Sequence, residues 1–147
     1  MAYALEPVLR HVDFRTVVID DREEYANPQR YPKADRTIVV DDFDDAFDDI
    51  ETDEDSYIII VTRGHRGDLK VLRQAIRRPF AYLGMIGSRR KNQLLYDTLR
   101  QEGVTEEQIA QIHAPIGLDI GSETPEEIAI SIVAEIISER AGKNRGQ

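Results

Sequence analysis

Four short runs of apolar, largely β-branched residues recur along this 147-residue chain, and most of them end in a polar turn. The runs are residues 16–19 (TVVI), 37–40 (TIVV), 57–61 (YIIIV) and 80–86 (FAYLGMI). Runs that are apolar on both faces are typical of a parallel sheet buried between helices. The segments 42–50, 67–77 and 88–101 have helical spacing. We therefore expect an α/β, doubly wound, mostly parallel sheet of Rossmann-like type.

The start of the chain departs from that pattern. Residues 2–11 have the spacing of a helix, whereas a dinucleotide-binding fold opens with a strand and a glycine-rich turn. We predict that the first strand and its glycine-rich turn are missing and that residues 1–13 form a partial first helix. The strand edge left open should be filled by another chain or segment, or the runs 16–19 and 57–61 should pair directly. This favours a homo-oligomer.

Composition sets further limits. The length fits one domain, residues 1–147, with residues 141–147 as a frayed tail. Cys is absent, which excludes disulfides, thiolate metal sites and a cysteine nucleophile. Nothing has the pattern of a signal peptide or membrane span, so we expect a cytoplasmic protein with no membrane partner. The formal charge of −9 argues against a general nucleic-acid binder.

Residues 41–55 concentrate the negative charge, with ten acidic residues and no Lys or Arg. Within this segment Phe43, Phe47 and Ile50 recur at spacings of four and three, which places them on one face of a helix. The pattern predicts a solvated amphipathic helix over 42–50, or a docking surface for a basic partner.

The turn after the fourth run is the first candidate site. An apolar run ends there, and Gly87 and Ser88 lead into three consecutive cations, Arg89, Arg90 and Lys91. If Ser88 opens a helix, the backbone donors of that first turn and the helix dipole converge on one spot and favour an anion. The alternative is that Ser88 only caps a helix whose first turn is basic.

The turn after the third run is the second candidate site. Gly64 and Gly67 permit a tight backbone, and Arg63, His65 and Arg66 supply donors for a ligand. His65 is either a proton carrier or a hydrogen-bonding residue. Asp68, which follows, has the pattern of a helix cap.

Two further carboxylates are candidates at the same sheet edge. Asp20 follows the first run, where a dinucleotide fold places the acid that binds a ribose hydroxyl, although Asp20 and Asp21 also suit an ordinary turn. Asp119 lies between Gly117 and Gly121 in a loop, and its carboxylate either faces a ligand or holds its own loop in place.

The last helix has a clear start signal. Thr124 as the cap, Pro125 at the first helical position and Glu127 three residues after Thr124 form a capping box. The helix that follows is expected to run to about Arg140, with Ile128, Ala129, Ile132, Val133, Ile136 and Ile137 as its core face.

Together these motifs resemble a known family. The segments 18–32 (VIDDREEYANPQRYP), 61–68 (VTRGHRGD), 82–91 (YLGMIGSRRK) and 113–136 (HAPIGLDIGSETPEEIAISIVAEI) are similar to the C-terminal Rossmann domain of the xanthine dehydrogenase accessory protein family, XdhC/CoxI. The resemblance spans nearly the whole chain. It departs from the family in two places, since most members have an additional N-terminal domain and a glycine-rich turn before the first helix.

The resemblance implies an accessory protein rather than a catalyst. Such a protein would bind molybdenum cofactor (molybdopterin) and assist its protection, maturation and insertion into a molybdenum hydroxylase such as xanthine dehydrogenase, with a cysteine desulfurase as a further partner. Two alternatives stay open: an NAD(P)- or nucleotide-binding module that acts as a sensor or oxidoreductase, and an interaction module that retains only the fold.

Overall fold

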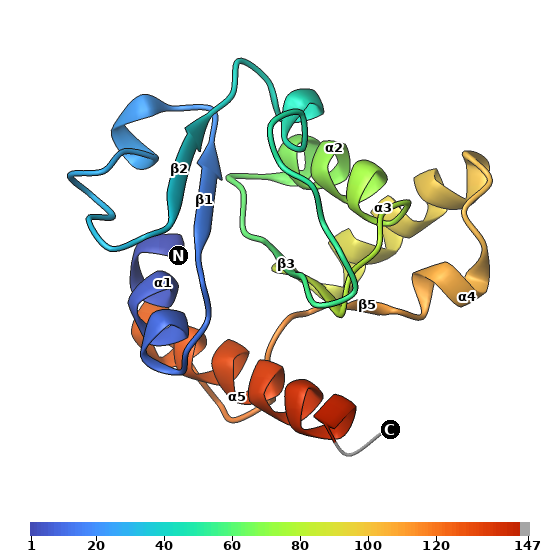
Figure 1. Ribbon diagram of the computed structural model, residues 1–147. Helices are drawn as coiled ribbons and strands as arrows, with labels where there is room; N and C mark the ends of the chain where they lie inside the picture. Colours follow the sequence, from blue (N-terminus) through green and yellow to red (C-terminus); the bar gives the residue numbers. More distant parts are fainter. Residues whose placement is uncertain (145–147) are drawn as a thin grey trace. The chain divides into compact units, whose positions relative to one another are not determined.

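The computed structural model describes residues 1–144 (Figure 1). Its chain divides into two compact units. The first unit combines residues 1–42 with the residues from 117 onward, and the second unit comprises residues 43–116. Each unit has its own parallel sheet.

The first unit contains the two ends of the chain. Strands β1 (Val17–Asp20) and β2 (Arg36–Val39) pair in parallel, with Val17 opposite Arg36. The connection between them contains a short 3-10 helix, η1 (Glu23–Tyr25). Helix α1 (Ala2–His11) packs against helix α5 (Pro125–Asn144).

Apolar side chains fill the contact between the helices of this unit. Leu5 is buried on α1, and α5 buries Ala129, Ile132, Val133 and Ile136. This confirms most of the predicted core face of α5, although Ile137 is 38% exposed. The predicted capping box is also present, because the Glu127 N–H donates to Thr124 Oγ1 while Glu127 Oε1 accepts from the Thr124 N–H.

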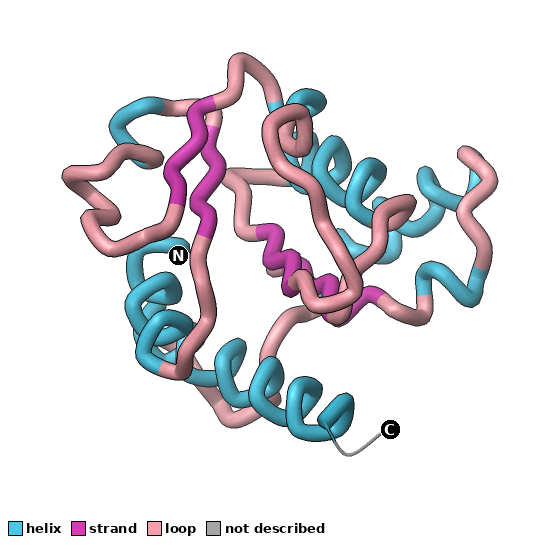
Figure 2. Tube along the Cα trace, viewed as in Figure 1, coloured by secondary structure: helices cyan, strands magenta, loops and turns pink. Residues whose placement is uncertain are grey.

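The second unit is a three-stranded sheet with helices. Strands β3 (Tyr57–Ile60), β4 (Tyr82–Met85) and β5 (Ile112–His113) are parallel and follow the order β3-β4-β5. Figure 2 marks these strands in magenta. The helical elements are η2 (Phe43–Asp45), α2 (His65–Ala75), α3 (Arg89–Gln101) and α4 (Glu106–Ile109).

One core joins the sheet of the second unit to its helices. Leu83 and Met85 of β4 are fully buried and share this core with Leu72 of α2 and Leu99 of α3. The opposite face of β4 carries Gly84, where an added Cβ would come within 2.6 Å of Ile116 Cδ1. Parallel strands and helices thus confirm the expected α/β, Rossmann-like class.

Several predicted elements need correction. The segment 42–50 is not a continuous helix but a 3-10 turn followed by hydrogen-bonded turns, although Phe47 is buried in the core as its pattern implied. Helix α2 begins at His65, before the predicted 67, and α5 continues to Asn144, past the predicted Arg140. Strand β5 lies where no strand was predicted. The last residues of the predicted tail, 145–147, lie outside the described residues.

The predicted open edge has a mixed outcome. Residues 2–11 are helical, as expected. The strand pairings of the described residues do not join β1 to β3, so the direct pairing of these two strands is not observed. Filling of the edge by another chain or segment stays a prediction. Within residues 1–144, no helix is both long and apolar enough to cross a membrane.

Candidate functional site

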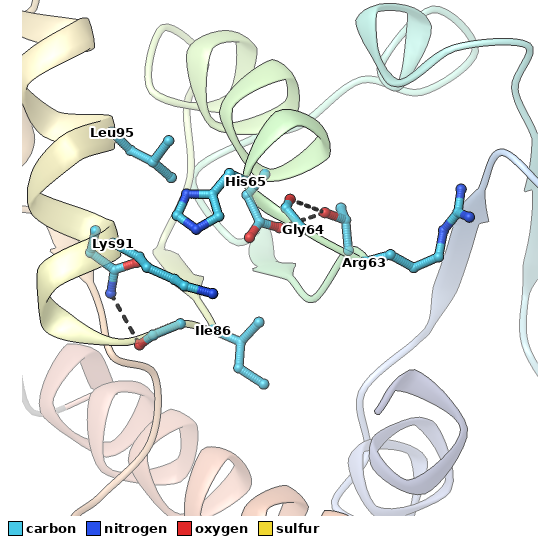
Figure 3. Close-up of a pocket in the computed structure, with 10 residues that line it drawn as sticks. Arg63, Gly64, His65, Ile86, Lys91 and Leu95 are labelled. Atoms are coloured by element: carbon cyan, nitrogen blue, oxygen red, sulfur yellow. Dashed lines mark hydrogen bonds between the residues drawn. The ribbon is translucent and has the colours of Figure 1, made fainter.

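A cavity of about 200 Å³ lies in the second unit, where β3 and β4 end and helices α2 and α3 begin. In a parallel sheet the carboxyl ends of strands are where ligands bind. Figure 3 shows the residues around the cavity. The lining residues are Thr62, Arg63, Gly64, His65, Asp68, Ile86, Gly87, Lys91, Asn92 and Leu95.

Two helix N-termini meet at this cavity. Helix α2 has Gly64 as its N-cap, and α3 has Ser88, whose Oγ accepts a hydrogen bond from the Lys91 N–H at 3.3 Å. The first N–H groups of a helix lack intrahelical acceptors and lie at the positive end of its dipole. No acidic residue occupies the first turn of α3 to balance that charge. Two such ends beside one cavity favour an anion.

Basic side chains also lie at this positive end. His65 from α2 and Lys91 from α3 both lie beside the cavity in Figure 3. Arg63 contributes to the lining, but its guanidinium extends away from His65 and Lys91. Ile86 and Leu95 supply an apolar wall. The cavity can therefore bind a ligand with an anionic group and a partly apolar body.

Asp68 and its hydrogen-bond partner Thr62 form another part of the lining. Thr62 Oγ1 lies 2.6 Å from Asp68 Oδ1 and 3.1 Å from the Gly64 carbonyl oxygen. Asp68 is only 8% exposed, and this burial raises the pKa of its carboxyl, while the hydrogen bond from Thr62 and the charge of His65 act in the opposite direction. Burial of a carboxylate disfavours its ionised form.

Asn92 and Gly87 form the adjoining wall. Asn92 is 2% exposed, and its Nδ2 donates to the Gly87 carbonyl oxygen at 3.3 Å. Gly87 has a φ of +135°, and an added Cβ there would lie 2.9 Å from Asn92 Oδ1. Both the backbone conformation and the space around Gly87 thus require glycine.

The structure brings together five of the residues predicted to bind a ligand: Arg63, Gly64, His65, Gly87 and Lys91. Ser88 caps α3, as its alternative interpretation proposed. Arg66, Arg89 and Arg90 are exposed and do not line this cavity. Their roles in cofactor binding stay predictions.

Sequence reasoning misjudged Asp68 and missed Thr62 and Asn92. Asp68 is not the cap of α2, because it lies inside the helix and its carboxylate contacts Thr62 instead. Asn92 lies one helical turn after Ser88. The available sequence signal was a polar residue that close to Gly87, and its burial is seen only in the structure. A contact such as that between Thr62 and Asp68 depends on tertiary packing, so spacing alone does not reveal it.

The other two predicted residues lie in the first unit. Asp20 is the last residue of β1, and its Oδ1 accepts from the Arg22 N–H at 3.0 Å and from Arg22 Nε at 3.1 Å. Asp119 is exposed in the loop between Gly117 and Gly121. Leu118 holds this loop to α5 by donating its N–H to the Ser131 carbonyl oxygen at 3.1 Å. Ligand binding by Asp20 and Asp119 stays a prediction.

Comparison with known proteins assigns the family. Residues 1–136 match the model of the XdhC Rossmann domain. This chain belongs to the XdhC Rossmann domain family. A crystal structure of a xanthine dehydrogenase from Bacillus halodurans superposes with a TM-score of 0.81 at 29% identity, covering 96% of this chain and 40% of that one. The agreement confirms the fold of this XdhC domain.

Three curated relatives place the XdhC domain among longer proteins. An uncharacterized Escherichia coli protein, YqeB, is 40% identical over 124 residues, 84% of this chain and 23% of that protein. A Bacillus subtilis protein described as a probable subunit of xanthine dehydrogenase is 29% identical over 86% of this chain and 36% of that protein. The Escherichia coli molybdenum cofactor insertion chaperone PaoD is 31% identical over 61% of this chain and 28% of its own length.

Proposed function

We propose that this XdhC domain binds molybdenum cofactor and assists its protection, maturation and insertion into a molybdenum hydroxylase such as xanthine dehydrogenase. The observation that carries the proposal is the cavity itself, where two helix N-termini and the side chains of His65 and Lys91 surround a space suited to an anion. Membership of the XdhC family and the similarity to a cofactor insertion chaperone support molybdenum cofactor as the ligand in this proposal.

The size of the cavity limits which part of the cofactor it would hold. Its volume of about 200 Å³ is below the range of about 300–1,000 Å³ that is typical of pockets for whole small-molecule ligands. The donors around it suit a phosphate, which is the anionic end of molybdopterin. The first-turn N–H groups of α2 and α3 that have no acceptor within the protein would hold that phosphate, with Lys91 as a charged donor and the His65 ring as a further donor.

The remaining residues of the cavity would orient and shield the ligand. Ile86 and Leu95 provide an apolar surface beside the anion site. When bound, the cofactor supplies the redox chemistry that the molybdenum hydroxylase uses, so the role of this chain is to bind and hand over rather than to catalyse. The proposal includes a cytoplasmic location, a homo-oligomeric state and a cysteine desulfurase as a further partner.

Calorimetric titration with molybdopterin species, NAD(H) and mononucleotides tests the proposal. Molybdopterin should bind best, and Lys91→Ala should weaken it by more than about tenfold because a charge-assisted hydrogen bond is lost. Lys33→Ala is the matched control, since this exposed lysine does not line the cavity and is not among the predicted site residues.

Two results would contradict the proposed function. Absence of molybdopterin binding at about 1 mM, where only about 4 kcal/mol is needed, would exclude a chaperone role for this domain. Tighter binding of NAD(H) than of molybdopterin would favour the alternative of a nucleotide-binding module.

A further inference from the structure

Asp68 is an acidic residue in a cavity whose other features favour an anion. Among the described residues that line the cavity it is the one acidic side chain, and it is buried while three cationic or ionisable basic residues surround the same space. A carboxylate beside a bound dianion would repel it, and low local dielectric strengthens that repulsion. The acid must therefore serve a purpose in binding or be neutral when the anion is present.

Hydrogen-bond counting leads to the same point. Thr62 Oγ1 carries a single hydrogen but lies within hydrogen-bonding distance of two acceptors, Asp68 Oδ1 and the Gly64 carbonyl oxygen. With Asp68 ionised, the hydroxyl can serve only one acceptor fully. With a proton on Asp68, the carboxyl donates to Thr62 and the hydroxyl donates to Gly64. The carboxyl, the hydroxyl and the carbonyl group then each have a hydrogen-bond partner.

We propose that the cavity binds its anion together with one proton, shared between Asp68 and the anion, so that the site selects phosphate over sulfate. The inference rests on the proposed function, because it takes the anion to occupy this cavity. Phosphate and phosphate monoesters can carry a proton near neutral pH and donate it to the carboxylate, with no change in covalent bonding. Sulfate cannot carry that proton, so with sulfate in the cavity Asp68 would have to carry the proton alone.

The other charged groups near Asp68 do not remove the need for this proton. His65 lies on α2 itself, Lys91 on α3 and Arg63 in the turn before α2. From η2, which packs against α2, Asp44 lies 3.7 Å from Lys70 Nζ and is exposed. His65 carries the imidazole of this set, so an experiment must separate any proton it takes up from that of Asp68.

Isothermal titration with methyl phosphate at about pH 8, where the dianion of this phosphate monoester predominates and carries no proton, measures the proton directly. Repeating the titration in buffers of different ionisation enthalpy gives the number of protons taken up. Wild-type protein should take up close to one proton for each methyl phosphate bound, and the same should hold for His65→Gln. Asp68→Asn should take up none.

The comparison of anions provides a second measurement. Sulfate should bind the wild-type protein at least about tenfold more weakly than phosphate, and Asp68→Asn should remove most of that difference. Asp97→Asn on α3 is the matched control, because it makes the same change of charge at an exposed side chain that does not line the cavity. Should Asp68→Asn fail to fold, Asp68→Ser carries the same expectation.

The outcomes separate this inference from the proposed function. Binding of methyl phosphate without proton uptake, or equal uptake by wild-type protein and Asp68→Asn, overturns proton sharing while molybdopterin binding can still be found. Loss of uptake in His65→Gln but not in Asp68→Asn assigns the proton to His65 and also overturns it. If neither anion binds to the wild-type protein, the inference fails whatever the titration with molybdopterin shows.

Discussion

Asp20 ends one parallel strand and Asp68 follows another, but their surroundings are opposite. Asp20, the last residue of β1, receives hydrogen bonds from both the backbone and the guanidinium of Arg22, whose guanidinium carbon also lies 3.8 Å from the centre of the Tyr25 ring. Asp68, after β3, is buried beside one hydroxyl that it shares with a carbonyl group. An acid satisfied by its own turn serves local structure, whereas an acid buried at a cavity points to a ligand.

The pKa values of the two carboxyls follow this contrast. Burial alone would raise the pKa of Asp20, but the hydrogen bonds from Arg22 and Asp21, together with the charge of Arg22, lower it below its usual range. For Asp68, burial prevails over the hydrogen bond from Thr62, and the pKa is raised. The same residue type therefore stabilises the fold at one strand end and costs stability at the other.

The largest expected effect comes from substituting Gly87, which lines the cavity. Gly87→Ala should lower the free energy of unfolding by about 2 kcal/mol, because a side chain at this positive φ is strained and its Cβ would lie 2.9 Å from Asn92 Oδ1. Ligand affinity should fall with it. Chemical denaturation measures the stability, and calorimetry measures the binding.

Gly103→Ala is the matched control for Gly87. Gly103 also has a positive φ, of +90°, but an added Cβ there would meet nothing within 4 Å. Its substitution carries backbone strain alone, so the loss of stability should be smaller and ligand binding should not change. Equal losses in the two variants would show that the contact between Gly87 and Asn92 has no energetic importance.

The second prediction concerns the acid of the cavity. Asp68→Asn should raise the free energy of unfolding at neutral pH by about 1 kcal/mol, because the amide can donate to Thr62 and leave the hydroxyl for Gly64. A raised pKa means that ionisation costs stability above the unfolded-state pKa, and that this cost disappears as the pH falls. The gain should therefore vanish in acid. Thermal unfolding across pH checks this, with Asp97→Asn as the control; a loss of stability at neutral pH would contradict it.

Sequence patterns located β1 to β4 to within about two residues, because each strand is a short apolar run rich in β-branched or aromatic residues, although of these four strands β4 alone is buried throughout. Strand β5 has only two residues, Ile112–His113, which is too short for any period to appear. The segment 42–50 had the apolar spacing of a helix and did not form one. Its carboxylates have no Lys or Arg within the segment to offset their repulsion, while Phe47 is buried without a continuous helix.

The candidate site was predictable where backbone chemistry defines it. Gly64, Gly87 and Lys91 were visible in the turns at strand ends, and the structure places these three residues at one cavity. The partner of Asp68 was not predictable, because Asp at the start of a helix is most often a cap. Only the packing that brings Thr62 within 2.6 Å of this carboxylate distinguishes the two roles.

The third prediction uses the capping box of α5 as a model for α3. Thr124 and Glu127 form that box, whereas α3 has Lys91 where α5 has Glu127. Lys91→Glu should raise the free energy of unfolding by about 0.5 kcal/mol, because the carboxylate completes the box and favours the helix dipole. It should also abolish phosphate binding.

Lys91→Met is the control for this substitution. Methionine removes the charge without supplying an acceptor for the Ser88 N–H, so phosphate binding should weaken while stability rises less than in Lys91→Glu. Denaturation and calorimetry on the same samples measure both quantities. If Lys91→Glu lowers stability, the basic first turn contributes to the fold rather than to a ligand, and the contrast between the two helix starts fails.

The last predicted effect has the opposite sign to that of Asp68→Asn. Asp20→Asn should lower the free energy of unfolding at neutral pH by about 0.5 kcal/mol, as expected for a partly exposed ion pair with Arg22. Because the pKa of Asp20 is lowered in the folded state, its contribution is present above the unfolded-state pKa and is lost as the pH falls through the folded-state pKa. Glu24→Gln, an exposed acid in the same turn, is the control and should change little. A gain in stability from Asp20→Asn would mean that Asp20, like Asp68, is kept at a cost to the fold, and the first unit would then need a ligand of its own to explain it.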